Sequence, residues 1–510
     1  MSLISMKFVV FVAAAVFGYY VIPKRFQWVW LLLFSYIYYA SSGVKFLFFL
    51  LFSTLTTYGA GRLLYAVRTS CTDKKKARFY GRIIVVCGLF LNFGMLAVMK
   101  YTNFVILNIN AVFGTQIDLF SLLLPLGISF YTFQSTGYVL DVYWGKCEPE
   151  RNVLRFALFV SFFPQILQGP IGRFHRLAGQ LYAEHTFDFQ RIERGLELIL
   201  WGFFKKMVLA DNAGVFVSAI FSDTQNYAGL SIFGVLGYSI QLYGDFSGGM
   251  DVVQGISNLF GITLDDNFKR PYFARSITDF WHRWHITLGT WMKDYVFYPV
   301  SLSGWMNRFS RFSKKRFGKS IGRTLPICLA NLIVFLVVGI WHGAAWKFIV
   351  YGLYNGIIIA VSGLLAGQYR SWKKALHINS SAWWYQLFQI LRTFLLVNIS
   401  WFFDRADSVP QALEMMRNAV TTFTPSELLS IPVQQNGSTA MTAAVLVILA
   451  AGCLMLFCVS VLQERGICVR EVLAKRPLVL RLAVYLALFF ALPCLGQPPS
   501  LTGGFIYAQF

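Results

Sequence analysis

The chain has 510 residues, of which 56% are apolar and 13% charged, and its 45 Lys and Arg against 23 Asp and Glu give a net charge of +22. Because soluble domains carry about 25% charged residues, this composition excludes a water-soluble globule, and the 17% aromatic content excludes a disordered chain. The cations lie in short clusters between apolar stretches, which is typical of membrane topology rather than of nucleic-acid binding. We therefore expect an all-α polytopic membrane protein.

The N-terminal apolar stretch lacks a basic n-region and continues into further apolar segments. It therefore predicts a retained membrane helix rather than a cleaved signal. The eight cysteines form no C-x-x-C pair, and several lie inside apolar runs. They predict neither a disulfide framework nor a cysteine zinc site.

Apolar stretches of spanning length follow one another along most of the chain, and we expect about 11–13 membrane helices from them. They are residues 5–22, 26–41, 44–66, 81–101, 119–144, 196–221, 228–243, 324–341, 346–366, 384–403, 441–462 and 477–495. A further stretch, 153–169, ends in polar residues and precedes Pro170. We expect this stretch to be re-entrant or partly buried.

Clustered cations predict the orientation of the chain. The clusters lie within residues 68–82, 308–323 and 465–481. Alternating the predicted spans puts all three on one side, which we assign to the cytoplasm, so the N-terminus and residues 403–440 lie outside. In this outer loop, Ser408 and Thr424 begin predicted capping boxes. The loop is either a short helix lying on the membrane or a docking surface for an extracellular partner.

Two histidine-containing segments are candidates for chemistry, since the sequence has no G-x-S-x-G, Walker A or H-E-x-x-H motif. In the first, Asp279, His282 and His285 are three apart, so on a helix they share a face and the carboxylate can fix a histidine tautomer. In the second, His342 stands between a predicted span and Gly343, and a histidine at membrane depth predicts a functional site. For His282 alone, a structural place on a tryptophan-rich helix at the membrane interface is favoured over a role in chemistry. A metal site formed by His282, His285 and His342 would need a further ligand, and no other histidine or cysteine lies at a regular spacing.

Polar residues inside apolar stretches form another group of candidates. Gln134, Gln168, Asp245 and Ser247 occur within or beside apolar stretches, and residues such as 125–127 break the helices around them. This pattern indicates a polar tunnel through the bundle. Interhelical hydrogen bonding or a transporter pore gives the same pattern, so these interpretations stay open.

At these residues the chain resembles the membrane-bound O-acyltransferase family, and most closely its alginate O-acetyltransferase branch. The likeness keeps its order along almost the whole chain. The segments that carry it are PLGISFYTFQ (125–134), FFPQILQGPIGRF (162–174), FFKKMVLADN (203–212), YGDFSGGMD (243–251), NFKRPYFARSITDFWHRWHITLGTWMKDYVFYPV (267–300), GIWHGAAWKFIVYGLYNG (339–356), SWFFDRADS (400–408) and FIYAQF (505–510). Asp404 and Ala508 depart from the branch, which usually has aromatic residues at both positions.

The resemblance implies a ring of membrane helices with a thin centre and a through-tunnel, formed as one domain by residues 1–510. It implies that His342 is the active-site histidine and His285 the second histidine. Further residues expected at the substrate site or along the tunnel are Trp341, Asp279, Gln134, Gln168, Arg173, Asp245, Ser247 and Asn267. We expect no metal and no tightly bound cofactor.

The resemblance also implies an activity. An acyl group, most simply acetyl from acetyl-CoA, passes from a cytoplasmic thioester across the bacterial plasma membrane to an envelope polysaccharide, with an extracytoplasmic SGNH-type acetyltransferase as partner. Independently, acyl transfer to a hydroxyl needs a general base, which neutral imidazole supplies near pH 7, and His285 or an amide can stabilise the oxyanion or orient the acceptor. The alternatives are D-alanyl transfer to teichoic acid from a carrier-protein thioester and a polytopic transporter without covalent chemistry.

Overall fold

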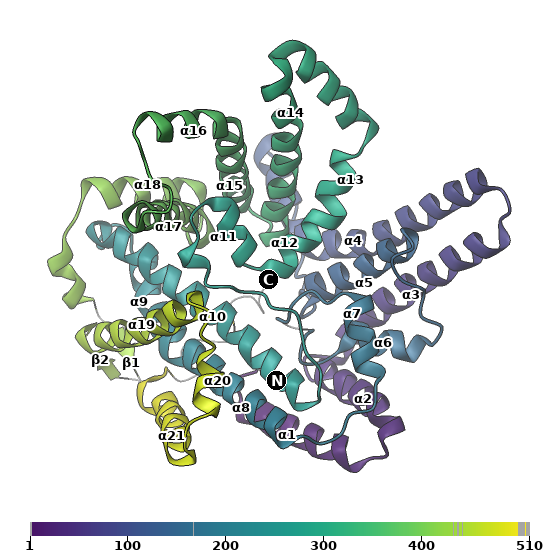
Figure 1. The fold of residues 1–510 in the computed structure, drawn as a ribbon, viewed down its shortest axis with the longest axis horizontal. Helices are drawn as coiled ribbons and strands as arrows, with labels where there is room; N and C mark the ends of the chain where they lie inside the picture. Colours follow the sequence, from purple (N-terminus) through teal and green to yellow (C-terminus); the bar gives the residue numbers. More distant parts are fainter. Residues whose placement is uncertain are drawn as a thin grey trace. The chain divides into compact units, whose positions relative to one another are not determined.

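The computed structural model describes residues 3–166, 168–431, 433–435, 438–440, 442–497 and 505. These residues are mainly α-helical, with one antiparallel hairpin of two short strands, β1 (Val433–Gln435) and β2 (Ser438–Ala440) (Figure 1). The predicted all-α class is therefore confirmed. Only Phe505 of the terminal FIYAQF segment is described, so the expected departure at Ala508 lies outside the described residues.

The chain divides into two compact units, and each is described by itself. Unit 1 comprises Met1–Val208, Gly244–Asp265 and Leu473–Phe510, and unit 2 comprises Leu209–Tyr243 and Asp266–Val472. Three elements continue from one unit into the other: η3 (Phe204–Ala210), α10 (Ser231–Leu259) and α20 (Val469–Ala474). The single domain and the ring with its tunnel stay predictions.

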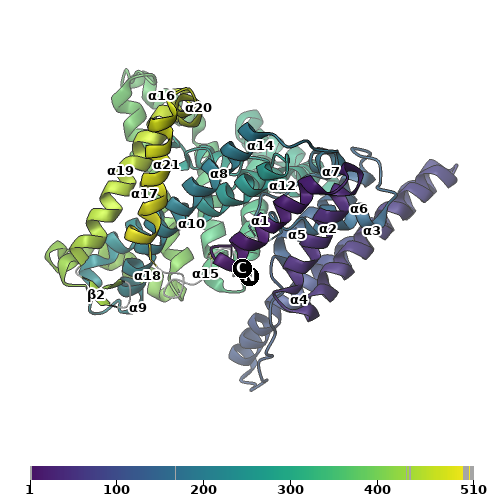
Figure 2. The ribbon, with the colours of Figure 1, turned by 90° about the horizontal axis from the view of Figure 1, so that it is seen from below.

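Unit 1 is centred on α5, whose residues are buried along nearly its whole length. Its elements are α1 (Met6–Val21), η1 (Lys24–Phe26), α2 (Gln27–Ala40), η2 (Val44–Phe46), α3 (Leu47–Ser70), α4 (Lys74–Phe113), α5 (Ile128–Tyr143), α6 (Val153–Ser161), α7 (Phe174–Tyr182), α8 (Phe189–Phe203) and α21 (Leu478–Leu495). Helices α3 and α4 pack against α5 (Figure 2). Gly61 permits this approach, because a Cβ there would lie 2.7 Å from the Tyr138 hydroxyl. Ser53 Oγ also donates to Asn92 Oδ1 at 2.7 Å, a buried hydrogen bond of the kind that joins membrane helices.

Unit 2 is organised around the helical hairpin of α14 and α15. Its elements are α9 (Asp211–Ser222), η4 (Ala228–Leu230), η5 (Pro271–Phe273), α11 (Ile277–Arg283), α12 (Ile286–Met292), η6 (Lys293–Phe297), α13 (Tyr298–Ser301), α14 (Gly304–His342), α15 (Trp346–Leu364), α16 (Ala366–Ala375), α17 (Trp383–Arg405), α18 (Val409–Thr421), η7 (Pro425–Ser430), β1, β2 and α19 (Thr442–Glu464). Gly339 and Gly352 bring the two helices together, because a Cβ on either would lie within 2.4 Å of a carbonyl oxygen of the other helix. Small residues allow this close packing of membrane helices.

Within the described residues, seven helices are long and apolar enough to cross a membrane, so the chain is a multi-pass membrane protein. They are Val44–Ser70, Lys74–Phe113, Gly304–His342, Trp346–Leu364, Trp383–Arg405, Ala443–Glu464 and Leu478–Leu495. This number is below the expected 11–13 because some apolar helices are short or interrupted. The expected span 119–144, for example, contains the 16-residue helix α5, and the span 196–221 is interrupted by η3, which holds two lysines.

Two non-spanning segments have most of their predicted local structure. In the stretch 153–169, α6 covers the first nine residues, and the described residues after it stay buried in turns up to Pro170. In the loop 403–440, Ser408 caps α18 by accepting from Gln411 N at 3.3 Å. The capping box predicted at Thr424 is wrong, because the Thr424 hydroxyl donates to Glu427 Oε2 at 2.8 Å and caps no backbone N–H among the described residues of η7. The exposed side of α18 includes Val420, which is 87% exposed.

Candidate active site

The segment that carries His285 forms two short helices with a break between them. α11 ends and α12 begins on either side of Trp284, which is extended, and His285, which has a left-handed φ of 47°. Backbone hydrogen bonds join both sides of the break to residues 267–269. Lys269 N donates to Arg283 O at 2.9 Å, and Ile286 N donates to Asn267 O at 3.0 Å. Asp279, His282 and His285 therefore do not share one helical face, and this prediction is wrong.

Asn267 determines which nitrogen of His285 carries the proton. Both residues are buried, each with 2% of its surface exposed. Asn267 Oδ1 accepts hydrogen bonds from Thr287 N at 3.0 Å and from Thr287 Oγ1 at 2.9 Å. Because a backbone N–H can only donate, the amide oxygen must face it. The same oxygen lies 3.2 Å from His285 Nδ1, so Nδ1 donates to it.

This hydrogen bond leaves Nε2 of the neutral His285 imidazole as the nitrogen without a proton. Burial lowers the pKa of His285 well below its ordinary value of 6.5, and the charge of a protonated His342 lowers it further. His285 is therefore neutral at physiological pH, and its Nε2 has a lone pair that can accept a hydrogen bond.

His342 is the last residue of α14 and is 3% exposed. Its ring centroid lies 5.2 Å from that of Trp341 and 5.1 Å from that of Tyr351, and it stacks on Phe348 at 6.3 Å. The Trp341 ring centroid also lies 5.6 Å from that of His285. The structure therefore brings both predicted histidines into contact with one indole, within unit 2.

Gly343 allows the stacking on His342. A Cβ at this position would lie 2.2 Å from a ring carbon of Phe348, which is too close for any ordinary contact. The small residue after the histidine thus makes room for Phe348 against the imidazole. The sequence indicated close approach at this turn but not which group approaches.

Asp279 lies in an arginine network. Its carboxylate accepts from Arg275 N at 3.0 Å and from Arg283 Nε at 2.9 Å, and Arg283 Nη1 also donates to Glu464 at 2.7 Å. His282 is exposed. The place of Asp279 along a tunnel stays a prediction, while its carboxylate binds the backbone N–H of Arg275 and the guanidinium of Arg283 in unit 2.

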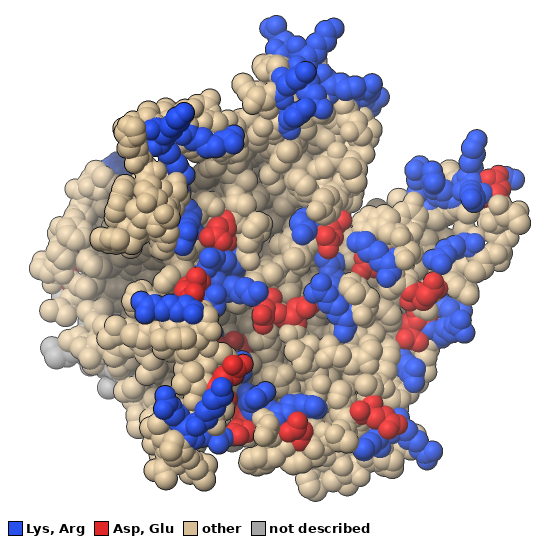
Figure 3. Space-filling view, in the orientation of Figure 1, with Lys and Arg blue, Asp and Glu red and all other residues tan. Residues whose placement is uncertain are grey.

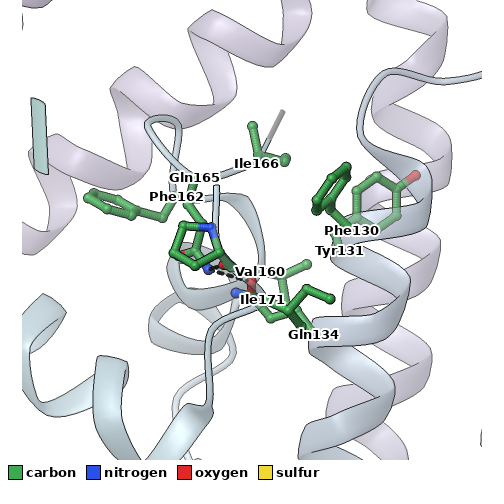
Figure 4. Close-up of a pocket in the computed structure, with 9 residues that line it drawn as sticks. Phe130, Tyr131, Gln134, Val160, Phe162, Gln165, Ile166 and Ile171 are labelled. Atoms are coloured by element: carbon green, nitrogen blue, oxygen red, sulfur yellow. Dashed lines mark hydrogen bonds between the residues drawn. The ribbon is translucent and has the colours of Figure 1, made fainter. Parts of the chain in front are cut away.

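In unit 1, Gln134 belongs to a pair of buried glutamines (Figure 4). Gln134 Oε1 accepts from Gln165 Nε2 at 2.9 Å, and the two Nε2 atoms also donate to the carbonyl oxygens of Phe159 and Pro170. The space among the surrounding aromatic and aliphatic side chains has no room for a water molecule. The glutamines therefore join α5 to the turn after α6, as a packed polar contact.

Gln168 and Arg173 are also buried in unit 1. The Gln168 amide packs on Gly249 of α10, where a Cβ would lie 2.7 Å from it. Neither polar atom of this amide has a hydrogen-bond partner among the described residues. Since an unpaired buried amide is costly, Gln168 is the predicted tunnel residue most able to take a polar ligand. Arg173 directly precedes α7.

Asp245 and Ser247 hold two buried lysines of η3. Lys206 Nζ lies 2.7 Å from Asp245 Oδ1, and Lys205 Nζ lies 3.0 Å from Ser247 Oγ and 2.7 Å from Asp251 Oδ2. A buried charge needs such a partner. Neither lysine was predicted as a site residue, although two consecutive cations inside an apolar run indicate buried acidic partners.

No three His, Cys, Asp or Glu side chains come close enough to hold a metal ion in the part of the chain that the structure describes. The ten predicted site residues fall into two groups. Unit 2 holds His285, His342, Trp341, Asn267 and Asp279, and unit 1 holds Gln134, Gln168, Arg173, Asp245 and Ser247. The first group contains the groups able to move a proton near neutral pH.

Comparison with known proteins gives consistent results. The model of the membrane-bound O-acyltransferase family (MBOAT) matches residues 150–313. The chain is 33% identical over 403 residues to the probable alginate O-acetylase AlgI of Azotobacter vinelandii, covering 78% of this chain and 73% of the relative. It is 32% identical over 442 residues to the peptidoglycan O-acetyltransferase of Helicobacter pylori, covering 80% and 78%. It is 29% identical over 275 residues to the teichoic acid D-alanyltransferase of Bacillus subtilis, covering 53% and 66%.

Proposed function

Because the chain belongs to the membrane-bound O-acyltransferase family and is therefore an O-acyltransferase, we propose that it transfers an acetyl group from cytoplasmic acetyl-CoA to hydroxyl groups of a cell-envelope polysaccharide. The observation that carries this proposal is the contact of two buried histidines, His285 and His342, with the indole of Trp341. The relatives named for acetyl transfer also match more of this chain than the one named for D-alanyl transfer.

His342 acts as the general base in this proposal. It takes the proton of the acceptor hydroxyl while the hydroxyl oxygen attacks the thioester carbonyl. The new C–O bond forms, the C–S bond breaks, and the thiolate of coenzyme A leaves and takes up the proton. A neutral imidazole in an aromatic, water-poor environment is suited to this step, and the burial of His342 supports the assignment.

His285 orients the acceptor. Its Nδ1–H is donated to Asn267, so the neutral ring presents Nε2 as an acceptor. Since the reacting hydroxyl gives its one proton to His342, His285 Nε2 accepts a hydrogen bond from a neighbouring hydroxyl of the acceptor, and it cannot donate to an oxyanion without first changing its protonation. This chemistry favours orientation of the acceptor over oxyanion stabilisation, the other role considered for His285.

The length of α14 supports entry of donor and acceptor from opposite sides. His342 lies nineteen positions after Arg323, the last cation of the basic cluster. At about 1.5 Å per residue this is roughly 28 Å of helix, close to the ~30 Å of a hydrocarbon core. Coenzyme A would approach from the basic side, and the acceptor would reach His342 from the other.

The proposal extends to location and partners. We assign the chain to the bacterial plasma membrane, with an SGNH-type acetyltransferase as an extracytoplasmic partner that completes delivery to the polysaccharide. The support is the names of the acetylating relatives and the exposed apolar side of α18, where Leu413 is 54% exposed.

Purified full-length protein, incubated with acetyl-CoA or with a D-alanyl carrier-protein thioester, tests the proposal through release of free thiol. We expect protein-dependent consumption of acetyl-CoA, a fall of about 10²–10⁴ in rate for His342→Ala, and little change for His282→Ala, the matched exposed control. Consumption of the D-alanyl thioester alone would assign the chain to teichoic acid modification instead. Consumption of neither donor by folded protein would favour a transporter without covalent chemistry.

A further inference from the structure

The first part of α14 is a basic arm, residues 304–323, that precedes the apolar part of the same helix. Gly318 has non-helical angles (φ 76°, ψ 171°), a conformation that favours glycine, and divides the arm into two helical pieces. A Cβ on Gly322 would lie 2.4 Å from Lys314 Cα, so the two pieces fold back on each other. Figure 1 shows this arm as the turn at the tip of α14.

The arm carries cations without counter-charges. Between residues 304 and 323 the sequence has Lys and Arg but no Asp or Glu. The cations are Arg308, Arg311, Lys314, Lys315, Arg316, Lys319 and Arg323, and all of them are exposed. No ion pair in the described part of the chain involves any of them. Figure 3 shows blue side chains gathered at the tip of α14. The arm is thus an unneutralised cationic surface.

Exposed aromatic residues accompany these cations. Trp305 is 44% exposed, Phe312 is 59% exposed and Phe317 is 51% exposed. Trp305 and Phe312 are seven residues apart and so share a helical face, while Arg311 and Lys315 share a different one. A helix with an aromatic face beside a basic face is typical of segments that lie in the headgroup layer of a membrane.

We propose that this basic arm binds the phosphate-bearing headgroups of anionic lipids in the leaflet at which α14 enters the membrane. The apolar part of α14 that follows, residues 324–341, has no charged residue, so the arm lies at the level where its span begins. Basic residues next to a span are attracted to anionic lipids, and the aromatic face inserts beside them. The inference does not rest on the proposed activity.

The arm and His342 belong to one helix. Headgroup binding at the start of α14 therefore sets the depth at which the other end of that helix, and its histidine, lies in the membrane. An acidic polypeptide would also neutralise the cations. The arm, however, adjoins an uncharged span, so the lipid headgroups of that leaflet are already within reach of its basic face and its aromatic face.

The test uses the full-length protein with its native cysteines replaced and one cysteine at Asn307, an exposed position of the arm, carrying an environment-sensitive fluorophore. The protein is placed in nanodiscs of phosphatidylcholine alone or mixed equally with phosphatidylglycerol. We expect a blue-shifted emission only with phosphatidylglycerol, reversed at ~1 M salt, where the Debye length is about 3 Å. Coenzyme A added to the neutral nanodiscs should cause no shift.

The variant R308Q/R311Q/K314Q/K315Q should lose the shift. At about fivefold in binding for each cation, four substitutions weaken the bound state on the order of several hundred-fold. The matched control K74Q/K75Q/K76Q/R78Q removes four exposed cations at the start of α4 and should keep the shift. An equal emission in both lipids, or a shift that survives the arm variant, would overturn the proposal. A shift caused by polyglutamate in neutral nanodiscs, with none from phosphatidylglycerol, would assign the arm to an acidic polypeptide instead.

Discussion

Asn267→Asp tests directly how the structure holds His285. A carboxylate has the shape of the amide and can accept from the same three donors, Thr287 N, Thr287 Oγ1 and His285 Nδ1. It differs in charge, so it stabilises the protonated imidazole. The substitution should therefore raise the pKa of His285 without removing its hydrogen bond.

The expected magnitude follows from the 3.2 Å between Asn267 Oδ1 and His285 Nδ1. Two opposite unit charges at this distance attract by about 5 kcal/mol at an effective dielectric constant of ~20, and burial of a new carboxylate offsets part of that. Oppositely charged neighbours shift a pKa by about 1–3 units. Since the pKa of His285 starts well below 6.5, the variant histidine should titrate closer to neutral pH.

The assay is the pH dependence of acetyl-CoA turnover by the purified protein. If turnover needs both His285 and His342 neutral, the acidic limb of the profile follows the histidine with the higher pKa. Raising the pKa of His285 then moves this limb to higher pH by up to about 1–3 units, and the rate recovers above the new limb. Asn398→Asp is the matched control, because Asn398 is also buried and its Oδ1 also accepts a hydrogen bond, from Ser239 Oγ at 2.9 Å. Its acidic limb should not move.

A second substitution makes the outcome decisive. Asn267→Leu removes the acceptor of His285 Nδ1 and should lower turnover by about 10–100-fold, as for other residues that orient a functional histidine. Folded proteins with an unmoved acidic limb for Asn267→Asp and a wild-type rate for Asn267→Leu would refute the reasoning. Size-exclusion profiles that match the wild type come first.

Three further predictions concern packing, buried charge and topology. Gly343→Ala should lower turnover by about 10²-fold, because its Cβ would meet the Phe348 ring at 2.2 Å and displace the ring stacked on His342. Gly343→Ala combined with Phe348→Ala should recover activity, and equal rates in the wild type and the single variant would contradict this. Lys206→Met should lower stability by about 3–5 kcal/mol because Asp245 stays buried without its cation, and Lys206→Met with Asp245→Leu should regain most of it in a thermal melt in detergent. A membrane-impermeant maleimide should label a single native Cys71 only after the cells are opened, and labelling of intact cells would reverse the predicted orientation.

The membrane character and the two histidines as candidate site residues could be predicted, because hydropathy reveals the first and the place of the histidines beside apolar stretches reveals the second. Uncharged stretches of spanning length follow from hydropathy alone. A histidine beside such a stretch, like His342, is costly unless it has a role, and the structure places its ring among aromatic residues. The small residue Gly343 was also readable as a site of close approach.

The local geometry around His285 could not be predicted from spacing. Helical periodicity assumes that the backbone stays helical, whereas the break at Trp284 depends on pairing with residues 267–269, which a local pattern does not reveal. For the same reason the ion pair of Lys206 with Asp245 was missed, since its partners are 39 positions apart. Both the helix break and the ion pair thus depend on contacts between residues far apart in the sequence.

The left-handed backbone at His285 restricts which residues can replace it. A φ of 47° is strained for most side chains, while His, Asn and Asp adopt that region several-fold more often than other non-glycine residues. The residue at position 285 must therefore supply an imidazole ring and also adopt a left-handed backbone conformation. Asparagine adopts this conformation but lacks the imidazole, whereas alanine lacks the ring and is strained in this conformation. Among non-glycine residues, asparagine and aspartate therefore replace this histidine with the least backbone strain, and the uncharged variant His285→Asn reports on the loss of the ring alone.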